Sequence, residues 1–280
     1  MAGTINFPTR PVIGLVSGVV IFVLFFGLQR YKVTGKTRDL PAAYRGDSDA
    51  SIEGYTIARS ALLIHGAPTT YVPSGDILRI RDFKFGTGHP YTGWAAAAAI
   101  DARGYFLTAA HCVRPGPVYL YVQGRVEKRL YQARVVWAGQ GPDAPDLALI
   151  YVPTPGVKTF DWADLPKPGD SLLGQGTHFT VGVIGADFFW GQVREVVNKS
   201  SVPGATIIYH DGPAQRGDSG GPVLSKDGRL LGINTGVDFL LGIGGVYWNS
   251  TRTRCVAIRP ESGWLQGMIE RDADEQKKLQ

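Results

Sequence analysis

Charged residues are few in this chain, and their scarcity limits the class of protein. Asp, Glu, Lys and Arg make up 19% of the 280 residues, whereas hydrophobic residues make up 44%. This balance excludes a disordered or highly charged chain. Cysteine is scarcer still, with two residues. The length is nevertheless sufficient for a hydrophobic core without disulfide staples, in one large domain or two small ones.

A basic excess is also missing from most of the chain, although the formal net charge is +5. Residues 1–45 hold six positive side chains and one negative, which accounts for the whole net charge. The charges of residues 46–280 therefore balance. Nucleic-acid binding proteins carry a basic surface that attracts phosphates, so we predict no nucleic-acid partner. A basic excess beside a hydrophobic run is typical of membrane-flanking charge.

Internal repeats are absent too, which excludes a collagen-like chain, a solenoid and a propeller. The 37 Gly, 18 Pro, 12 Phe, 12 Tyr and 6 Trp suit short strands joined by tight turns. Apolar positions on one face predict a helix from Glu261 onward. A sandwich or a two-barrel protein fits this pattern. Apolar runs bounded by Gly and Pro predict strands at 118–122, 133–138, 146–152, 179–184, 207–209 and 230–234.

Residues 11–29 form one run of 19 residues without a charge. A bilayer core requires about 17–25 apolar residues in a helix, so we predict an uncleaved transmembrane helix here, after an N-terminal tail at 1–10. A cleaved signal peptide is the alternative. It would have a shorter apolar region and a small-residue cleavage site, whereas Gln29-Arg30-Tyr31-Lys32 follows this run.

The flanking charges give an orientation for the predicted helix. Lys and Arg occur four times between residues 30 and 38, and once before the helix, at Arg10. Taken alone, this asymmetry places the C-terminal part of the chain in the cytoplasm. Residues 30–75 have the composition of a linker with one strand near 61–64, and residues 271–280 that of a polar tail.

Three short motifs carry the chemistry of the chain. They are LTAAHCV at 107–113, PDLALI at 145–150 and GDSGGPV at 217–223. Serine is a weak nucleophile at neutral pH and requires an adjacent base. The imidazole of His111 suits that role, and the carboxylate of Asp146, at the start of an apolar strand, can hold the imidazole in one tautomer. Ser219 is then the candidate nucleophile.

The glycines around Ser219 serve a second purpose. Acyl transfer develops negative charge on an oxygen, and backbone N–H groups must converge on it. We expect the N–H groups of Gly217 and Ser219 to form this oxyanion hole. Each motif taken alone also has a structural interpretation. The first would contain a structural histidine, the second would begin a strand, and the third would form a turn. Their occurrence in this order, in a strand-rich chain, favours catalysis.

The three motifs together resemble the trypsin/chymotrypsin superfamily of serine proteases, over roughly residues 76–270. The resemblance implies a chymotrypsin-like, all-β protease domain of two antiparallel β-barrels with a C-terminal helix and a site in the cleft between the barrels. It also implies the roles of three residues. His111 would act as the base and then as the acid, Asp146 would orient it, and Ser219 would attack the substrate.

The segment DGRLLGINT at 227–235 is similar to the bacterial HtrA-type branch of this superfamily. The resemblance implies that the Thr235 hydroxyl supports Asp146, and that the strand at Asn234, Thr235 and Gly236 pairs with an extended substrate. HtrA-type enzymes usually carry a PDZ domain after the protease, and we expect none here. Assembly of several copies into a homo-oligomer is compatible with the resemblance.

Several positions depart from the mammalian enzymes. No Ile-Val-Gly-Gly type activation sequence is present to supply a partner for Asp218. Pro213 stands six residues before Ser219, where trypsin-like enzymes carry the acid of the primary pocket, so we predict cleavage after small or medium apolar residues. Arg216 is either a solvated loop cation or a contact to substrate. Cys255 either narrows the primary pocket or is an inert buried residue.

The remaining candidate residues suggest neither a disulfide nor a metal site. Cys112 has no cysteine upstream at the position where many relatives have one, and Cys255 should lie beyond the ~7 Å Cα limit for a disulfide, so we predict two free thiols. Two free thiols agree with the flanking charges in favouring the cytoplasm. No metal-ligand spacing is present among the other histidines, His65, His89, His178 and His210.

The sequence therefore predicts a membrane-anchored serine endopeptidase that acts on polypeptides and requires no cofactor. Residues 11–29 would hold it in the membrane, and the resemblance favours an extracytoplasmic protease domain despite the flanking charges. Two alternatives remain: a catalytically silent, membrane-tethered peptide-binding module of the same fold, and a hydrolase of small esters or amides.

Overall fold

The computed structural model describes part of the chain. The chain divides into two compact units, residues 1–40 and 41–280, and all the described residues lie in the second. The transmembrane helix predicted at 11–29 lies outside them. Within the described residues, no helix has the length and apolar character to cross a membrane. The described ranges are 51–65, 68–71, 78–79, 83–85, 93–113, 117–122, 130–140, 144–154, 156–180, 183–199, 205–214, 217–238 and 254–278.

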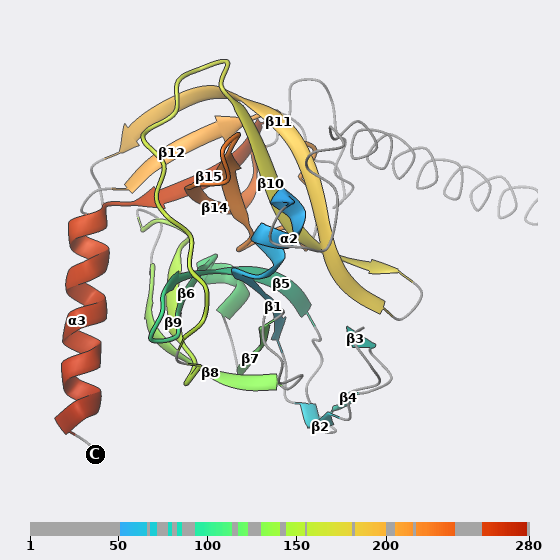
Figure 1. Ribbon diagram of the computed structural model, residues 1–280, viewed down its shortest axis with the longest axis vertical. Helices are drawn as coiled ribbons and strands as arrows, with labels where there is room; N and C mark the ends of the chain where they lie inside the picture. Colours follow the sequence, from blue (N-terminus) through green and yellow to red (C-terminus); the bar gives the residue numbers. More distant parts are fainter. Residues whose placement is uncertain are drawn as a thin grey trace, which may run out of the picture. The chain divides into compact units, whose positions relative to one another are not determined.

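Six antiparallel strands close into a first barrel (Figure 1). Ala61 of the first strand pairs with Ala97 on one side and with Val122 on the other, which closes the ring. Alternate alanines of the second strand, among them Ala97, lie in the barrel core. In hydrogen-bonding order the strands are β1 (Ser60–His65), β5 (Gly93–Asp101), β6 (Tyr105–Thr108), β9 (Ala148–Tyr151), β8 (Leu130–Ala138) and β7 (Val118–Val122).

A second barrel also has six antiparallel strands. Leu173 of strand β10 (Ser171–Thr180) pairs with Leu224 on one side and with Trp190 on the other, which closes this sheet. Short strands at the periphery are β3 (Leu78–Arg79), which extends this sheet, and β2 (Pro68–Tyr71) with β4 (Phe83–Phe85). The barrel strands are β10 (Ser171–Thr180), β13 (Pro222–Ser225), β14 (Leu230–Asp238), β15 (Arg254–Pro260), β12 (Ala205–His210) and β11 (Val183–Lys199).

The two-barrel, mostly β architecture predicted from the sequence is confirmed, as is the C-terminal helix. The apolar runs predicted as strands contain or overlap β7, β8, β9, β10, β11, β12 and β14. Strands β7 and β9 are buried along most of their length, as continuous apolar runs predict, whereas β8 is largely exposed or half-buried.

The first described segment differs from the sequence analysis, which placed residues 30–75 in a linker. Helix α2 (Ile52–Ile57) begins at Ser51, whose side chain accepts the N–H of Gly54 at 3.1 Å. The helix packs on the second barrel, since a Cβ at Gly228 would lie 3.1 Å from Ile52. Strand β1 then enters the first barrel. The strand predicted near 61–64 is confirmed as β1, and the folded region extends before it to residues 51–60, which the sequence analysis placed in the linker.

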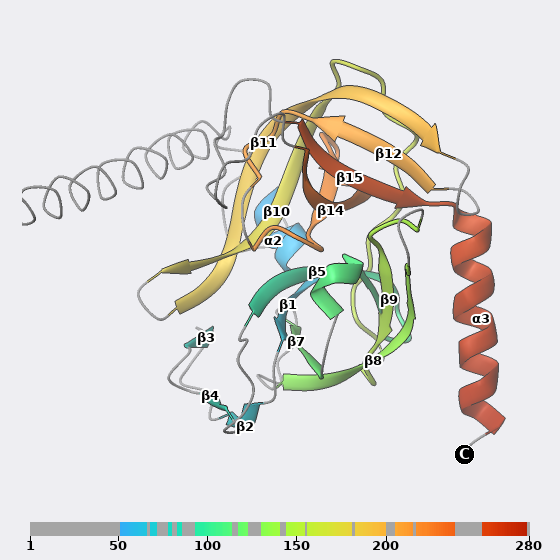
Figure 2. The same cartoon turned by 180° about the vertical axis from the view of Figure 1, so that it is seen from behind.

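Helix α3 (Ser262–Lys278) follows the last strand of the second barrel and runs beside the first (Figures 1 and 2). Arg134 of β8 donates two hydrogen bonds to Asp272, at 2.6 and 2.7 Å, and the Tyr105 hydroxyl donates a third at 2.8 Å. The Trp137 and Trp264 rings meet edge to face at 4.8 Å. The helix thus links the barrels, and residues 271–278, expected in a polar tail, are helical because Asp272 is bound.

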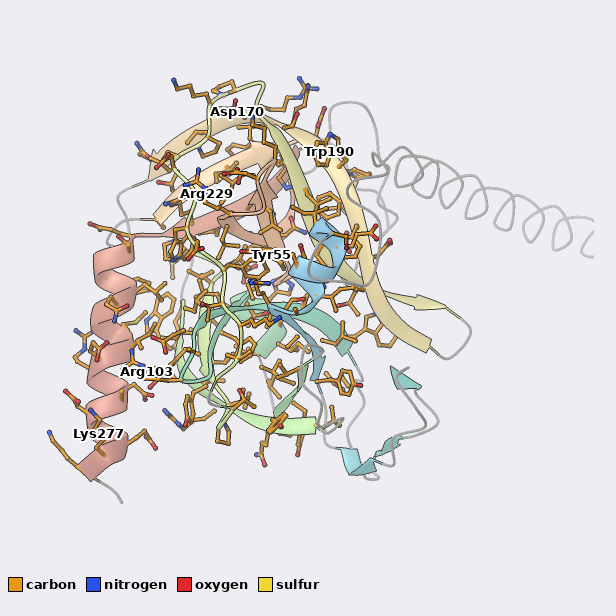
Figure 3. All side chains as sticks on the ribbon, viewed as in Figure 1. Tyr55, Arg103, Asp170, Trp190, Arg229 and Lys277 are labelled. Atoms are coloured by element: carbon orange, nitrogen blue, oxygen red, sulfur yellow. The ribbon has the colours of Figure 1, made fainter. Side chains whose placement is uncertain are left out.

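Arg103 adds an outer contact to the same interface. Its guanidinium lies 2.8 Å from Asp101 of the first barrel and 2.9 Å from Glu270 of α3 (Figure 3). Both partners are partly exposed, so water and salt screen this interaction. The buried Asp272 is therefore the stronger anchor of the helix.

Replacing Asp272 by Asn should lower the free energy of unfolding by about 2 kcal/mol, because the exchange removes the negative charge and one of the two acceptor oxygens that bind Arg134 and Tyr105, at a side chain that is 8% exposed. Hydrogen bonding to Arg134 lowers the pKa of Asp272 in the folded state. The stabilisation is therefore present above the unfolded-state pKa of about 3.9 and is lost as the pH falls through the lower folded value.

Urea unfolding from pH 7 to pH 2 measures both effects. The difference between wild type and Asp272→Asn should shrink below about pH 4. Asp274→Asn, which removes an exposed pair with Lys277 on the same helix, should cost less than about 0.5 kcal/mol. Equal effects of the two substitutions would contradict the anchoring role of Asp272.

Candidate active site

His111 and Asp146 form a two-point contact on the first barrel. His111 lies on a short 3-10 helix (Ala110–Val113) that follows β6, and Asp146 lies just before β9. The ring Nδ1 of His111 is 2.6 Å from Asp146 Oδ2, and the backbone N–H of His111 donates to Oδ1 at 2.8 Å. Because a carboxylate only accepts, Nδ1 carries the proton and Nε2 is left as a base.

This contact also makes the imidazole more basic. The hydrogen bond that the His111 ring donates to Asp146 raises the pKa of His111, Cys112 adds to the effect, and desolvation opposes it. The His111 side chain is 51% exposed, so a substrate or solvent can reach it. A general base requires both properties.

Ser219 lies on the turn that precedes β13 of the second barrel, between two glycines with positive φ. Gly217 has φ of 102° and Gly220 has φ of 78°, and only glycine adopts these values at little cost. A Cβ at Gly217 would collide with the Thr177 carbonyl oxygen, and one at Gly220 with the Ala96 carbonyl oxygen. The glycines of the motif are thus required by the close approach of other strands.

Backbone hydrogen bonds hold the turn from both sides. The Ala96 N–H of β5 donates to the Ser219 carbonyl at 2.9 Å, which ties the turn to the first barrel. Behind it, the Gly220 N–H donates to the Asn234 carbonyl at 2.7 Å. The carboxylate of Asp218 is buried against Gly176 of β10, where a side chain would collide with it.

The predicted substrate-binding residues lie in two places. Pro213 is buried in the loop after β12. Asn234, Thr235 and Gly236 lie on β14, beside β15. Arg216 lies outside the described residues. The structure places Cys255 in β15, opposite His210 in the strand register, and its side chain lies outside the description.

The Thr235 hydroxyl donates to the Val256 carbonyl at 3.3 Å. The support of Asp146 by Thr235, which the resemblance implied, stays a prediction. Cys112 is a free, buried thiol, as predicted.

Sequence reasoning missed several residues that shape the site. Ala96, Thr177 and Gly176 contact the turn at residues 217–221 that carries Ser219, yet no motif contains them. The run of five alanines at 95–99 was a usable signal, because small side chains permit the close approach of another backbone. Thr177 shows this approach, since its hydroxyl donates to the Ala95 carbonyl at 2.9 Å.

A pocket of about 650 Å³ lies along β8 of the first barrel. Val113, two residues after His111, and Ala144, two residues before Asp146, contribute to its lining together with Val135 and Trp137. Within the described part of the chain, no three His, Cys, Asp or Glu side chains gather closely enough to hold a metal ion.

Residues 92–233, just over half of the chain, match the family described as trypsin-like peptidase domain, and the chain belongs to this family. It is 27% identical to the magnetosome formation protease MamE of Magnetospirillum gryphiswaldense over 171 residues, which are 58% of this chain and 21% of that protein. MamE of Paramagnetospirillum magneticum is 28% identical over 172 residues, 58% of this chain and 23% of that protein. The chain spans about a fifth of the length of these relatives.

Solved structures of HtrA-type proteases share the fold. The HtrA-type protease AlgW with decapeptide is 21% identical with a TM-score of 0.55, covering 80% of this chain and 68% of that one. A variant of AlgW with tripeptide is 19% identical with a TM-score of 0.54, covering 78% of this chain and 62% of that one. The resemblance to a trypsin/chymotrypsin-type protease is thereby confirmed.

Replacing Gly220 by Ala should lower the free energy of unfolding by about 3 kcal/mol or more, because a strained φ and a collision with Ala96 combine. Gly156 is a matched control, since its φ of 76° is nearly the same and nothing lies within 4 Å of its would-be Cβ. Gly156→Ala should cost about 1–2 kcal/mol. Thermal and urea unfolding measure both, and equal losses would show that the interbarrel contact is not tight.

Proposed function

We propose that the chain is a serine endopeptidase in which His111, Asp146 and Ser219 act as a catalytic triad. The single observation that carries the proposal is the two-point contact of Asp146 with the His111 ring and backbone, which leaves Nε2 free to take a proton. Membership of the trypsin-like peptidase family supports it. No cofactor enters this chemistry.

The reaction follows from these residues. The Ser219 hydroxyl attacks the scissile carbonyl carbon while His111 Nε2 takes its proton. The N–H groups of Gly217 and Ser219 stabilise the negative oxygen of the tetrahedral intermediate. The intermediate expels the amine, which takes the proton from His111, and water then releases the acyl group by the same steps. Asp146 remains ionised and stabilises the imidazolium.

We propose an extended polypeptide as the substrate. Its backbone would pair with Asn234, Thr235 and Gly236 of β14, and Pro213 with Cys255 would bound a pocket for small or medium apolar side chains. The HtrA-type neighbours determined with a tripeptide and a decapeptide support a peptide substrate. Arg216 is a further candidate contact.

The cellular setting is also a proposal. Residues 11–29 would anchor the chain in a membrane, and the protease domain would lie outside the cytoplasm. The uncharged run and its flanking Lys and Arg residues support the anchor. Assembly into a homo-oligomer remains part of the same proposal.

A fluorophosphonate probe tests Ser219 directly. The wild type should be labelled, and Ser219→Ala should not be, while its peptide hydrolysis falls by about 10⁶-fold. Ser225→Ala is the control, because Ser225 lies six residues along the same segment and hydrogen-bonds Asp227 instead. Equal labelling of Ser219→Ala would remove Ser219 as nucleophile, and a folded but unlabelled wild type would favour a silent peptide-binding module.

The pH dependence of kcat/KM tests the His111–Asp146 contact. The base acts only when neutral, and its pKa is raised, so the acid limb of the profile should lie above the ordinary histidine value of about 6.5. Asp146→Asn removes the largest cause of the shift. Its acid limb should move to lower pH, and its plateau should fall by about 10⁴-fold. An unmoved limb would show that Asp146 does not act on His111.

A further inference from the structure

His210 is a buried imidazole that the proposed triad does not use. It ends β12, where the chain enters the loop that leads to Pro213 and then to Gly217. Its side chain is fully buried. Its backbone is paired with Val193 of β11 and with Cys255 of β15, so the position of the residue is set by two neighbouring strands.

The His210 ring is held on one side by the loop that follows it. The Gly212 N–H donates to Nδ1 at 3.2 Å, and the ring stacks on Phe189 with centroids 5.8 Å apart and planes 11° apart. A Cβ at Gly212 would lie 2.7 Å from Phe189 and 3.0 Å from Nδ1. Because Nδ1 accepts a hydrogen bond, the proton of the neutral ring lies on Nε2.

The other side of the ring lies near Asn234. His210 Nε2 and Asn234 Oδ1 are both buried, and neither has a hydrogen-bond partner among the described residues. Burial lowers the pKa of His210 to about 4, and the Asn234 side chain and Asp211 act against this shift. Asp211 is itself paired with Arg194. The two side chains thus interact, and each contributes a buried polar atom without a partner within the described residues, an N–H donor on His210 and a carboxamide oxygen on Asn234.

The second amide atom of Asn234 connects this pair of side chains to the turn that carries Ser219. Asn234 Nδ2 donates to the Asp218 carbonyl at 3.2 Å, and the Gly221 N–H donates to the same oxygen at 3.1 Å. The Asp218 carbonyl and the Ser219 N–H belong to one trans peptide, in which they point in opposite directions. Holding that carbonyl inward therefore directs the Ser219 N–H outward, as an oxyanion donor requires.

We propose that His210 is a positioning residue for the oxyanion hole: its Nε2–H orients the Asn234 carboxamide, which holds the Asp218 carbonyl and so aims the Ser219 N–H. The inference rests on the proposed peptidase function. Through Gly212, the same ring also fixes the start of the loop that carries Pro213. The His210 imidazole thus contacts both the loop that carries Pro213 of the proposed primary pocket and, through Asn234, the peptide that carries the Ser219 N–H.

Substitutions of His210 separate positioning from packing. His210→Phe keeps a ring against Phe189 and removes both nitrogens, whereas His210→Gln keeps an N–H donor near the Nε2 position. For the folded fraction of each variant, His210→Phe should lower kcat by at least about 10-fold with KM within about threefold, because losing a whole oxyanion donor costs about 10²–10³. His210→Gln should recover most of the loss.

A double-variant cycle tests the link through Asn234. Asn234→Leu should lower kcat about as much as His210→Phe, and the double variant should lose no more than the worse single variant. Thr206→Val is the control on the same strand, since Thr206 hydrogen-bonds Asn198 at the other end of β12. A full kcat in His210→Phe, or losses that multiply in the double variant, would overturn the proposal.

Nitrogen NMR of the wild-type histidines provides a readout that does not depend on catalysis. His210 should show one ring proton, on Nε2, should stay neutral between pH 5 and pH 8, and should shift in Asn234→Leu. A ring proton on Nδ1, or titration near the ordinary value of about 6.5, would refute the inference even if the chain were an active peptidase. If the wild type neither hydrolyses peptide nor takes up the fluorophosphonate, the proposed function fails instead.

Discussion

The turn that carries Ser219 meets the first barrel through a backbone hydrogen bond, from the Ala96 N–H to the Ser219 carbonyl at 2.9 Å. The rest of the structure depends on this approach. The turn can come so close because β5 presents alanine at the point of contact and the turn presents Gly220. A side chain at Gly220 would collide with the Ala96 carbonyl and with Thr108, and would move Ser219 away from the barrel that carries His111.

The proposed triad is divided between the barrels. His111 and Asp146 bind each other within the first barrel, so their mutual geometry does not depend on the second. Ser219 is positioned by the second barrel. The elements that link the barrels therefore affect the geometry of the proposed triad. Two of them lie far from the site in sequence. Helix α2 packs against Gly228, and helix α3 is bound to β8 through Asp272 and Arg134.

Polar groups behind Ser219 form the other support of the site. The interior of the second barrel holds Asp218, His210 and Asn234, all almost completely buried. Buried polar groups are costly unless they are satisfied, and here their hydrogen bonds end on the loop at Gly212 and on the peptide that contains the Ser219 N–H. Such groups orient a backbone more specifically than apolar packing does, because hydrogen bonds are directional.

The sequence by itself was sufficient for the fold class and for the residues of the proposed triad. Short apolar runs with Gly or Pro boundaries are local signals, and the motifs at His111, Asp146 and Ser219 place three chemical groups in a known order. Only the tertiary structure decided that the helix at Ile52–Ile57 belongs to the folded region, that the Thr235 hydroxyl donates to the Val256 carbonyl, and that the His210 side chain interacts with Asn234. These features depend on contacts between residues far apart in the chain, and neither side-chain periodicity nor local spacing encodes which distant groups meet.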